Sequence, residues 1–146
     1  MEKAANRAKI NIVSGPWQKP QVLCLLKEIA IEDYIIFLKP TRPEFPNDAS
    51  EEEIEEVAAH FDHLNRALND GRLLLAGRTV GERPYGIVML KAKNYEEAKS
   101  FLDEDPAIRS GVFEADLQGF RIALMHEFLA AQREMEAAME RHRSGL

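Results

Sequence analysis

The stretch SEEEIEEVAAHFDHLNRALNDG, residues 50–71, carries the strongest pattern in the chain. It begins with Ser50 three residues before Glu53, the spacing at which a hydroxyl and a carboxylate each accept a hydrogen bond from a free backbone N–H at the start of a helix. Apolar residues then recur at steps of three and four until Gly71, a residue type that often ends helices. The stretch predicts an amphipathic helix with a buried stripe made of Ile54, Val57, Ala58, Phe61, Leu64, Asn65 and Leu68.

Segments rich in β-branched, aromatic and other apolar residues flank this helix. Residues 33–38 precede it, and residues 72–76 and 85–91 follow it as two short strand-like runs. A second helix is predicted after Asn94, where the capping-box spacing recurs, and a last strand over residues 112–117. The order β-α-β-β-α-β is that of the ferredoxin-like split unit. We therefore expect an α+β fold, ferredoxin-like βαββαβ, with helices on one face of an antiparallel sheet.

The two ends of the chain lie outside this unit. Residues 1–31 lack a regular period and predict an N-terminal extension, residues 32–125 form the expected domain, and residues 126–146 have the spacing of an extra C-terminal helix. The sheet face opposite the helices needs a cover, which a second copy of the sheet would supply, so we expect a homodimer. The C-terminal helix would either embrace the partner or fold back on its own subunit.

Composition excludes several classes of partner. The net charge of −6 over 146 residues argues against nucleic acid, because binding to phosphates needs clustered Lys and Arg. The single cysteine, Cys24, cannot form an internal disulfide, and its position in an apolar run predicts a buried thiol and a reducing compartment. No apolar stretch approaches the ~20 residues that span a bilayer. We therefore expect a cytoplasmic protein without a membrane or nucleic-acid partner.

Two segments resemble the YCII-related (YciI-like) family. In residues 60–77 a helix histidine stands eleven residues before the first glycine of a Gly-x-Leu-Leu-x-Ala-Gly motif, and in residues 105–113 an Asp-Pro pair is followed by Gly-Val. His60 and Asp105 occupy the positions of the family's histidine and aspartate. The resemblance covers roughly residues 33–124. It implies a dimeric α/β barrel similar to muconolactone isomerase-like proteins, with a pocket between helix and sheet.

The resemblance also implies roles for particular residues. His60 and Asp105 would be a catalytic acid–base pair, and Gly77 and Arg78 would lie near the pocket rim, where Arg78 replaces the proline that family members often carry. Arg109 is, with Arg78, a candidate to hold a substrate carboxylate. The sequence contains no phosphate-binding glycine loop, zinc-ligand spacing or nucleophile motif, so neither a cofactor nor a metal is expected.

Helical geometry bears on the two histidines of the first helix. With 3.6 residues per turn, His60 lies about 90° from the centre of the apolar stripe, at an edge that can face a cleft, and His63 lies about 150° away, where we expect it to face water. That divergence favours a solvated face over a metal site formed by the two histidines and Glu56. A histidine at a helix edge can exchange protons near neutral pH if Asp105 fixes its tautomer. Purely structural roles for His60 and Asp105 are the simpler alternative.

Two functions follow from these observations. The first is a cofactor-free isomerase or lyase that acts on a small organic acid or lactone, in which His60 moves a proton next to a carbonyl and Asp105 orients the imidazole. The second is a non-catalytic dimeric module that binds a metabolite or a partner protein. Convergence of the two side chains on one open cavity would favour the enzyme.

Overall fold

The computed structural model describes residues 16, 18–20, 22 and 33–145. The chain divides into two units, Ile29–Arg121 and a second unit that contains the C-terminal helix, and each is described by itself. The buried thiol expected at Cys24 and most of the expected extension, residues 1–31, lie outside the described residues. The expected division at residues 32 and 126 stays a prediction.

Four antiparallel strands form the sheet of the first unit. They are β1 (Asp33–Pro40), β2 (Leu73–Arg78), β3 (Gly86–Lys91) and β4 (Phe113–Phe120). Their order is β2-β3-β1-β4, so the first strand lies in the interior of the sheet between β3 and β4. This order places the chain's first and third strands centrally and its second and fourth at the edges. The expected α+β, ferredoxin-like βαββαβ fold is confirmed.

Three helices belong to this unit, α2 (Glu51–Asn69), α3 (Tyr95–Asp103) and α4 (Pro106–Arg109), and α5 (Glu127–Arg143) is the expected C-terminal helix. The capping box predicted at the start of α2 is present, because Ser50 Oγ accepts from the Glu53 N–H and the Glu53 carboxylate accepts from the Ser50 N–H. Gly71 ends this helix with φ of +73°. The segment after Asp105, for which the sequence predicts no helix, forms the short helix α4.

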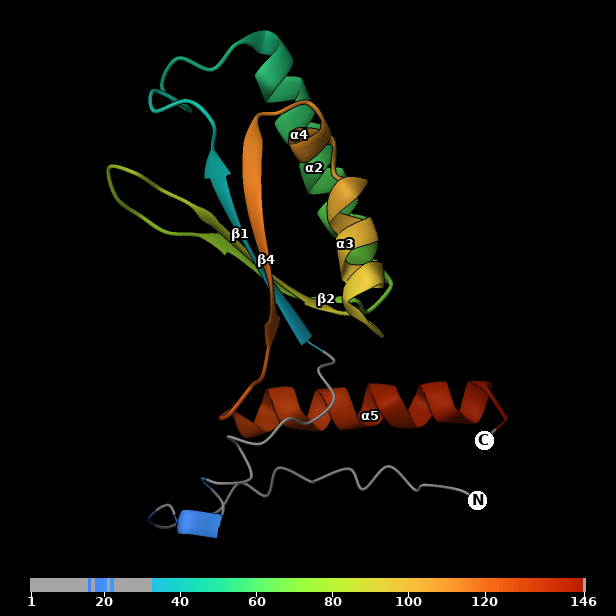
Figure 1. Cartoon of the computed structure of the whole chain (residues 1–146). Helices are drawn as coiled ribbons and strands as arrows, with labels where there is room; N and C mark the ends of the chain where they lie inside the picture. Colours follow the sequence, from blue (N-terminus) through green and yellow to red (C-terminus); the bar gives the residue numbers. More distant parts are fainter. Residues whose placement is uncertain (1–15, 17, 21, 23–32, 146) are drawn as a thin grey trace. The chain divides into compact units, whose positions relative to one another are not determined.

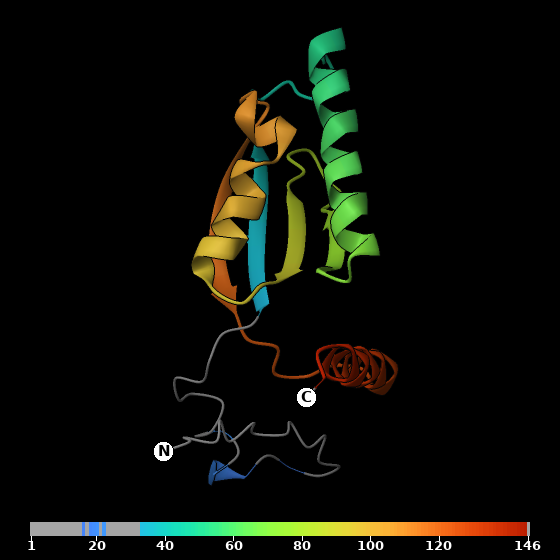
Figure 2. The ribbon, with the colours of Figure 1, turned by 90° about the vertical axis from the view of Figure 1, so that its right-hand side faces the viewer.

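The core lies between the sheet and the helices on one of its faces. In β1 the side chains of Tyr34, Ile36 and Leu38 are buried and alternate with half-buried neighbours, as expected when one sheet face is covered. Figures 1 and 2 show α2, α3 and α4 on the same side of the sheet. The core cluster joins these strand residues to Leu64 and Ala67 of α2, Leu73 of β2, Val88 and Leu90 of β3, Ala92, and Ala98, Phe101 and Leu102 of α3.

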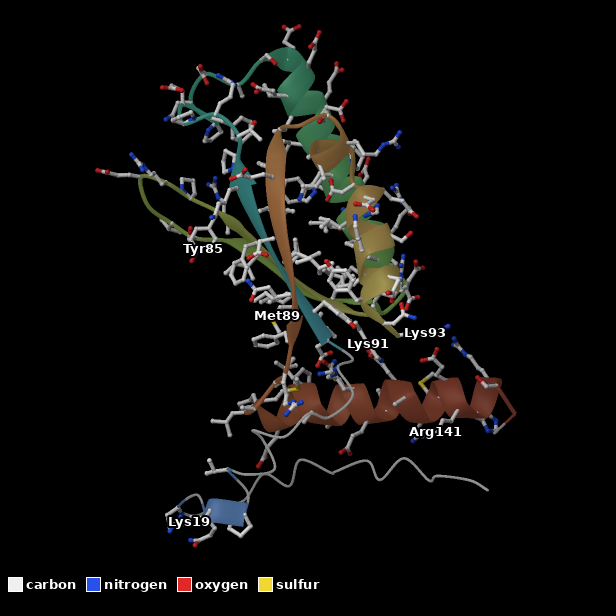
Figure 3. The ribbon with its side chains drawn as sticks, in the orientation of Figure 1. Lys19, Tyr85, Met89, Lys91, Lys93 and Arg141 are labelled. Atoms are coloured by element: carbon white, nitrogen blue, oxygen red, sulfur yellow. The ribbon has the colours of Figure 1, made fainter. Side chains whose placement is uncertain are left out.

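The opposite face of the sheet carries an apolar patch. Ile35 pairs with Met89 and Phe37 with Ile87 in the β1–β3 register, so these four side chains share the face that points away from the core. Tyr85 extends the patch, with its ring centroid 6.2 Å from that of Phe37. Figure 3 labels Tyr85 and Met89 on this open side. No helix within residues 33–121 lies on it (Figures 1 and 2).

The buried side of α2 differs from the predicted one. Ile54, Phe61 and Leu68, which were expected in the core, are 58%, 58% and 53% exposed. The residues buried on this helix are His60, His63, Leu64 and Ala67. The core-facing side is therefore rotated by roughly 100° from the apolar stripe. This side of α2 packs against α4 and β2.

Helix α5 is described on its own. His126 caps its first turn, with Nδ1 accepting from the Phe128 N–H at 3.3 Å. The helix contains no buried residue, and its large apolar side chains, Phe128, Leu129, Met135 and Met139, are all exposed. The described helices include none long and apolar enough to cross a membrane.

Candidate active site

His60 and Asp105 form a buried pair. His60 projects from the middle of α2, Asp105 caps the start of α4, and the His60 Nδ1 lies 2.7 Å from the Asp105 Oδ2. His60 is 5% exposed and Asp105 is 2% exposed. The two residues are 45 positions apart in the chain, so only the packing of α2 on α4 brings them together.

Local sequence fixes the aspartate before the histidine reaches it. Asp105 is the N-cap of α4, and its Oδ1 accepts a hydrogen bond from the Ala107 N–H at 3.0 Å. Pro106 follows at the first helical position, where the missing N–H costs nothing and the fixed φ favours a helix. One carboxylate oxygen is thus occupied by the backbone, which leaves Oδ2 to receive the imidazole.

The pairing fixes the tautomer of His60. A carboxylate oxygen can only accept, so the imidazole Nδ1 carries a hydrogen and donates it, and in the neutral ring the lone pair lies on Nε2. Within the described part of the chain, Nε2 has no hydrogen-bond partner. No side-chain nitrogen or oxygen there is both fully buried and without a partner. This nitrogen is therefore not completely enclosed, and it is the atom that could exchange a proton with a ligand.

Aromatic rings border the imidazole on two sides. The centroids of Phe61 and Phe113 lie 5.4 Å and 5.7 Å from that of His60, both in edge-to-face geometry. Phe113 also contacts Phe45 at 5.7 Å. These rings hold the imidazole orientation and exclude water from most of its surface.

His63 does not face water, and this prediction was wrong. It is 7% exposed, its Nε2 donates to the Phe101 carbonyl at 2.9 Å, and its ring stacks on the Phe101 ring at 4.3 Å. The Arg72 guanidinium lies 5.6 Å from the same Phe101 ring. Because α2 is rotated, both histidines point inward, one towards α4 and one towards α3. His63 therefore joins α2 to α3 and has no part in a solvated face.

The other predicted site residues lie apart from the pair. Gly77 and Arg78 are exposed on β2, which is the sheet edge opposite β4. Arg109 is exposed at the end of α4, one turn after Asp105, whose carbonyl accepts from the Arg109 N–H at 3.0 Å. Among the described residues, none of these three has a side-chain hydrogen bond to His60 or Asp105. Of the two predicted arginines, Arg109 is the one that lies on α4, the helix that Asp105 caps.

A cavity of about 480 Å³ opens beside the first turns of α2. Its lining includes Arg42, Asp48, Glu52, Glu53 and Glu56 together with Ser50, Ser110 and Val112, but neither member of the pair. Along the chain, however, Glu56 comes one helical turn before His60, and Val112 precedes Phe113. The cavity is therefore lined by neighbours of the pair and is strongly acidic.

Arg42 organises the wall of this cavity. Its guanidinium donates to both oxygens of Glu53, at 2.9 and 2.7 Å, and to both oxygens of Asp48, at 3.0 and 3.1 Å. The hydrogen bonds from Arg42, aided by the Ser50 N–H, lower the pKa of Glu53 from 4.5 to about 2. The same hydrogen bonds, from Glu53 first and Asp48 second, raise the pKa of Arg42. The described residues contain no group of three or more His, Cys, Asp or Glu side chains that could hold a metal ion.

Sequence reasoning missed the aromatic surroundings of the pair and the buried position of His63. Phe113 directly follows the Gly-Val pair of the second motif, so its place beside Asp105 could have been suspected from that motif. The burial of His63 had a weaker signal. It shares the buried side of the helix with Ala67, a small residue that allows close packing, and with Leu64, the one large apolar residue buried on α2.

Comparisons with known proteins give one family and a distant structural likeness. A family model described as the YCII-related domain matches residues 34–116, more than half of the chain. One similar solved structure is 5-chloro-2-hydroxyhydroquinone dehydrochlorinase from Burkholderia phenoliruptrix AC1100 in complex with 2,5-dihydroxybenzoquinone. It is 18% identical with a TM-score of 0.49, and the match covers 61% of this chain and 93% of that chain. No curated protein matches the chain.

Proposed function

The chain belongs to the YCII-related family, and we propose that it is a cofactor-free isomerase or lyase in which His60 transfers a proton on a small organic acid or lactone. The observation that carries this proposal is the buried 2.7 Å contact between the His60 Nδ1 and the Asp105 Oδ2, combined with an Nε2 that has no hydrogen-bond partner among the described residues. This is the arrangement of a general base whose tautomer is set by a carboxylate.

The proposed chemistry is a balanced proton transfer. The Nε2 lone pair removes a proton from a carbon next to the substrate carbonyl, and the C–H electron pair becomes part of an enolate. The imidazolium that forms is stabilised by the Asp105 carboxylate, which already accepts from its Nδ1–H. The same proton then returns to another carbon, which completes an isomerisation, or to a leaving group, which completes an elimination. Arg109, one turn beyond Asp105, would hold the substrate carboxylate.

A homodimer formed through the open sheet face is part of the proposal. Ile35, Phe37, Ile87 and Met89 are half-buried and adjoin one another on that face, and monomeric proteins rarely leave a large apolar surface uncovered. A second copy is a suitable cover because two equivalent sheets can pack face to face. We expect Met89→Glu to lower the sedimentation coefficient of the chain at micromolar concentration. A wild-type chain that sediments as a monomer would refute the sheet dimer.

The catalytic proposal is tested by solvent isotope exchange. A thermal-shift screen of small carboxylic acids and lactones first selects ligands, since a ligand at 100 times its Kd stabilises the fold by ~2.7 kcal/mol. Each hit is then incubated in D₂O, and ¹H NMR follows the loss of its carbon-bound protons. We expect exchange with the wild type and at least ~100-fold slower exchange with His60→Asn. His142→Asn, which changes an exposed histidine of α5, is the matched control. Equal exchange by His60→Asn and wild type would eliminate His60 as the base.

A binding module without catalysis is the second candidate, favoured by one observation. The cavity of about 480 Å³ is lined by Arg42 and carboxylates rather than by His60 or Asp105. On this alternative the pair has a structural role and a ligand occupies the acidic cavity. The same screen distinguishes the two, because ligands that stabilise the wild type and His60→Asn equally, and lose no protons to solvent, support the module.

A further inference from the structure

The loop of residues 41–49, which joins β1 to α2, is anchored beside the strand that carries Phe113. Thr41 donates from its N–H to the Val112 carbonyl at 3.0 Å and from Oγ1 to the Gly111 carbonyl at 2.7 Å. Val112 directly precedes Phe113, the first residue of β4. At its other end the loop runs into the capped first turn of α2. Both ends of the loop are therefore fixed, and one of them lies next to Phe113.

Arg42 clamps this loop. Its guanidinium donates to both oxygens of Asp48, six residues further along the chain, and to both oxygens of Glu53 in the first turn of α2. These contacts use four of the five N–H groups of the side chain, so Arg42 is committed to the loop and has little capacity left for an anionic ligand. They also hold the pKa of Glu53 at about 2, so this part of the clamp stays ionised at neutral pH.

The clamped loop carries Phe45 to the candidate site. Phe45 lies between Arg42 and Asp48 in the chain and is half-buried. Its ring centroid is 5.7 Å from that of Phe113, at an interplanar angle of 89°. The Phe113 ring in turn lies 5.7 Å from the imidazole of His60, also edge-to-face. A row of three rings therefore leads from the loop to the candidate base.

We propose that Arg42 is a positioning residue for His60 and acts through the rings of Phe45 and Phe113. By fixing the shape of the loop, Arg42 keeps Phe45 packed on Phe113. The two packed rings then hold the imidazole against Asp105 and limit the entry of water to that hydrogen bond. The word positioning rests on the proposed function, in which His60 is the base. The coupling between the loop and the imidazole is measured without a substrate.

The hydrogen on the His60 Nδ1 is a probe that separates positioning from overall stability. The Arg42 side chain is 40% exposed, and exposed ion pairs contribute little to the free energy of unfolding. The Nδ1 hydrogen lies in the buried contact with Asp105, so it exchanges with water only when that contact opens. Its ¹H signal is identified by its absence in His60→Asn.

The experiment measures this exchange in the full chain with Arg42→Gln, Phe45→Ala and the double variant. A lost edge-to-face ring contact changes an opening equilibrium about 2- to 10-fold, so we expect each single variant to accelerate exchange by that factor. The double variant should be no faster than the faster single variant, because both changes remove the same contact. If Phe45→Ala fails to fold, Phe45→Leu takes its place, since it removes the ring and keeps an apolar side chain. Lys99→Gln is the matched control, because it also removes an exposed cation bound to both oxygens of a carboxylate, but on α3, and it should leave exchange unchanged.

A second measurement uses a ligand from the thermal-shift screen. In Arg42→Gln the loss of carbon-bound protons at saturating ligand should slow about 2- to 10-fold, while the Kd of the ligand stays the same. Arg42→Lys should recover part of the rate, because lysine retains the charge but cannot bridge two carboxylates as a guanidinium does.

Each result supports or overturns the role of Arg42. Unchanged Nδ1 exchange in Arg42→Gln would overturn it, and additive effects in the double variant would show that Arg42 does not act through Phe45. A weaker Kd in Arg42→Gln with unchanged Nδ1 exchange would mean that Arg42 binds the ligand in the acidic cavity instead. If the wild type removes no proton from any ligand while the variants still accelerate Nδ1 exchange, the coupling stands and only the catalytic proposal is refuted.

Discussion

Replacing Asp105 by Asn or by Ala separates the structural role of this carboxylate from its effect on His60. In the wild type, Oδ1 accepts from the Ala107 N–H and Oδ2 accepts from the His60 Nδ1–H. Asn can keep the first bond with its single oxygen, but the amide group that then faces His60 can only donate. The His60 Nδ1 must then accept that hydrogen bond, so the ring hydrogen moves to Nε2 and the lone pair on Nε2 is lost.

The magnitudes follow from the burial of the pair. Asp105→Ala removes the N-cap of α4, worth ~1 kcal/mol, and leaves a buried imidazole N–H without a partner, worth ~1–3 kcal/mol. We expect a loss of about 2–4 kcal/mol in the free energy of unfolding. Asp105→Asn exchanges a charge-assisted hydrogen bond for a neutral one while retaining the cap, so its loss should be about 1 kcal/mol. We therefore expect the two variants to differ in the free energy of unfolding more than in the activity that depends on Nε2.

Urea unfolding followed by circular dichroism gives the free energies, and long-range ¹H–¹⁵N correlation spectra give the tautomer. The chain has four histidines, and the signals that disappear in His60→Asn identify those of His60. In the wild type Nδ1 should carry the hydrogen, and in Asp105→Asn Nε2 should carry it. An Asp105→Ala chain with an unchanged urea midpoint, or an Asp105→Asn chain that retains the hydrogen on Nδ1, would refute the assignment of this carboxylate as the group that fixes His60.

Three further predictions use other contacts. His63→Ala should lower the free energy of unfolding by roughly 2 kcal/mol or more in urea titrations, because it leaves the Phe101 carbonyl unpaired and a cavity the size of the imidazole ring. A change under ~0.5 kcal/mol would mean that His63 is solvated. Arg42 and Ser50 hold the pKa of Glu53 near 2, below 4.5, so this contact stabilises the fold above about pH 4.5 and its contribution is lost as the pH falls towards 2. The melting temperatures of Glu53→Gln and the wild type should therefore converge over that range. A difference in melting temperature that stays constant with pH would contradict the ion pair. Gly71→Ala should destabilise by ~1 kcal/mol in urea titrations, because φ is +73° there and no atom lies near enough to gain a contact, whereas a stabilised variant would show that the helix ends differently.

The order of elements could be predicted because local signals carry it. The capping box of Ser50 and Glu53 marks the start of α2, Gly71 marks its end, and both work through backbone hydrogen bonds or dihedral preferences that need no tertiary context. The strands were found to within a few residues for a similar reason, because alternation and turn residues are read locally. The short helix α4 was missed since four residues are too few to show a helical period.

The orientation of α2 could not be predicted in the same way. A single chain's hydrophobic period identifies an apolar side, but it does not say whether that side faces the core or another molecule. On α2 the large apolar residues Ile54, Phe61 and Leu68 face outward, and the inward side is filled by Leu64, Ala67 and two histidines. The pairing of His60 with Asp105 was suggested by the family resemblance. Its geometry was beyond the sequence, because it depends on how α2 and α4 cross.

The orientation of α2 determines both which side chains form the candidate site and which apolar side chains, Ile54, Phe61 and Leu68, are exposed. Burying His60 and His63 requires that each ring find a polar partner, and both do, in Asp105 on one side and the Phe101 carbonyl on the other. An ordinary amphipathic helix would bury Phe61 and leave His60 at the edge, with greater stability in the isolated chain and no imidazole held against a carboxylate. The sequence instead retains apolar residues on the outer side, where they are costly unless covered. One rotation of α2 thus accounts both for the buried contact of His60 with Asp105 and for the exposed side chains of Ile54, Phe61 and Leu68.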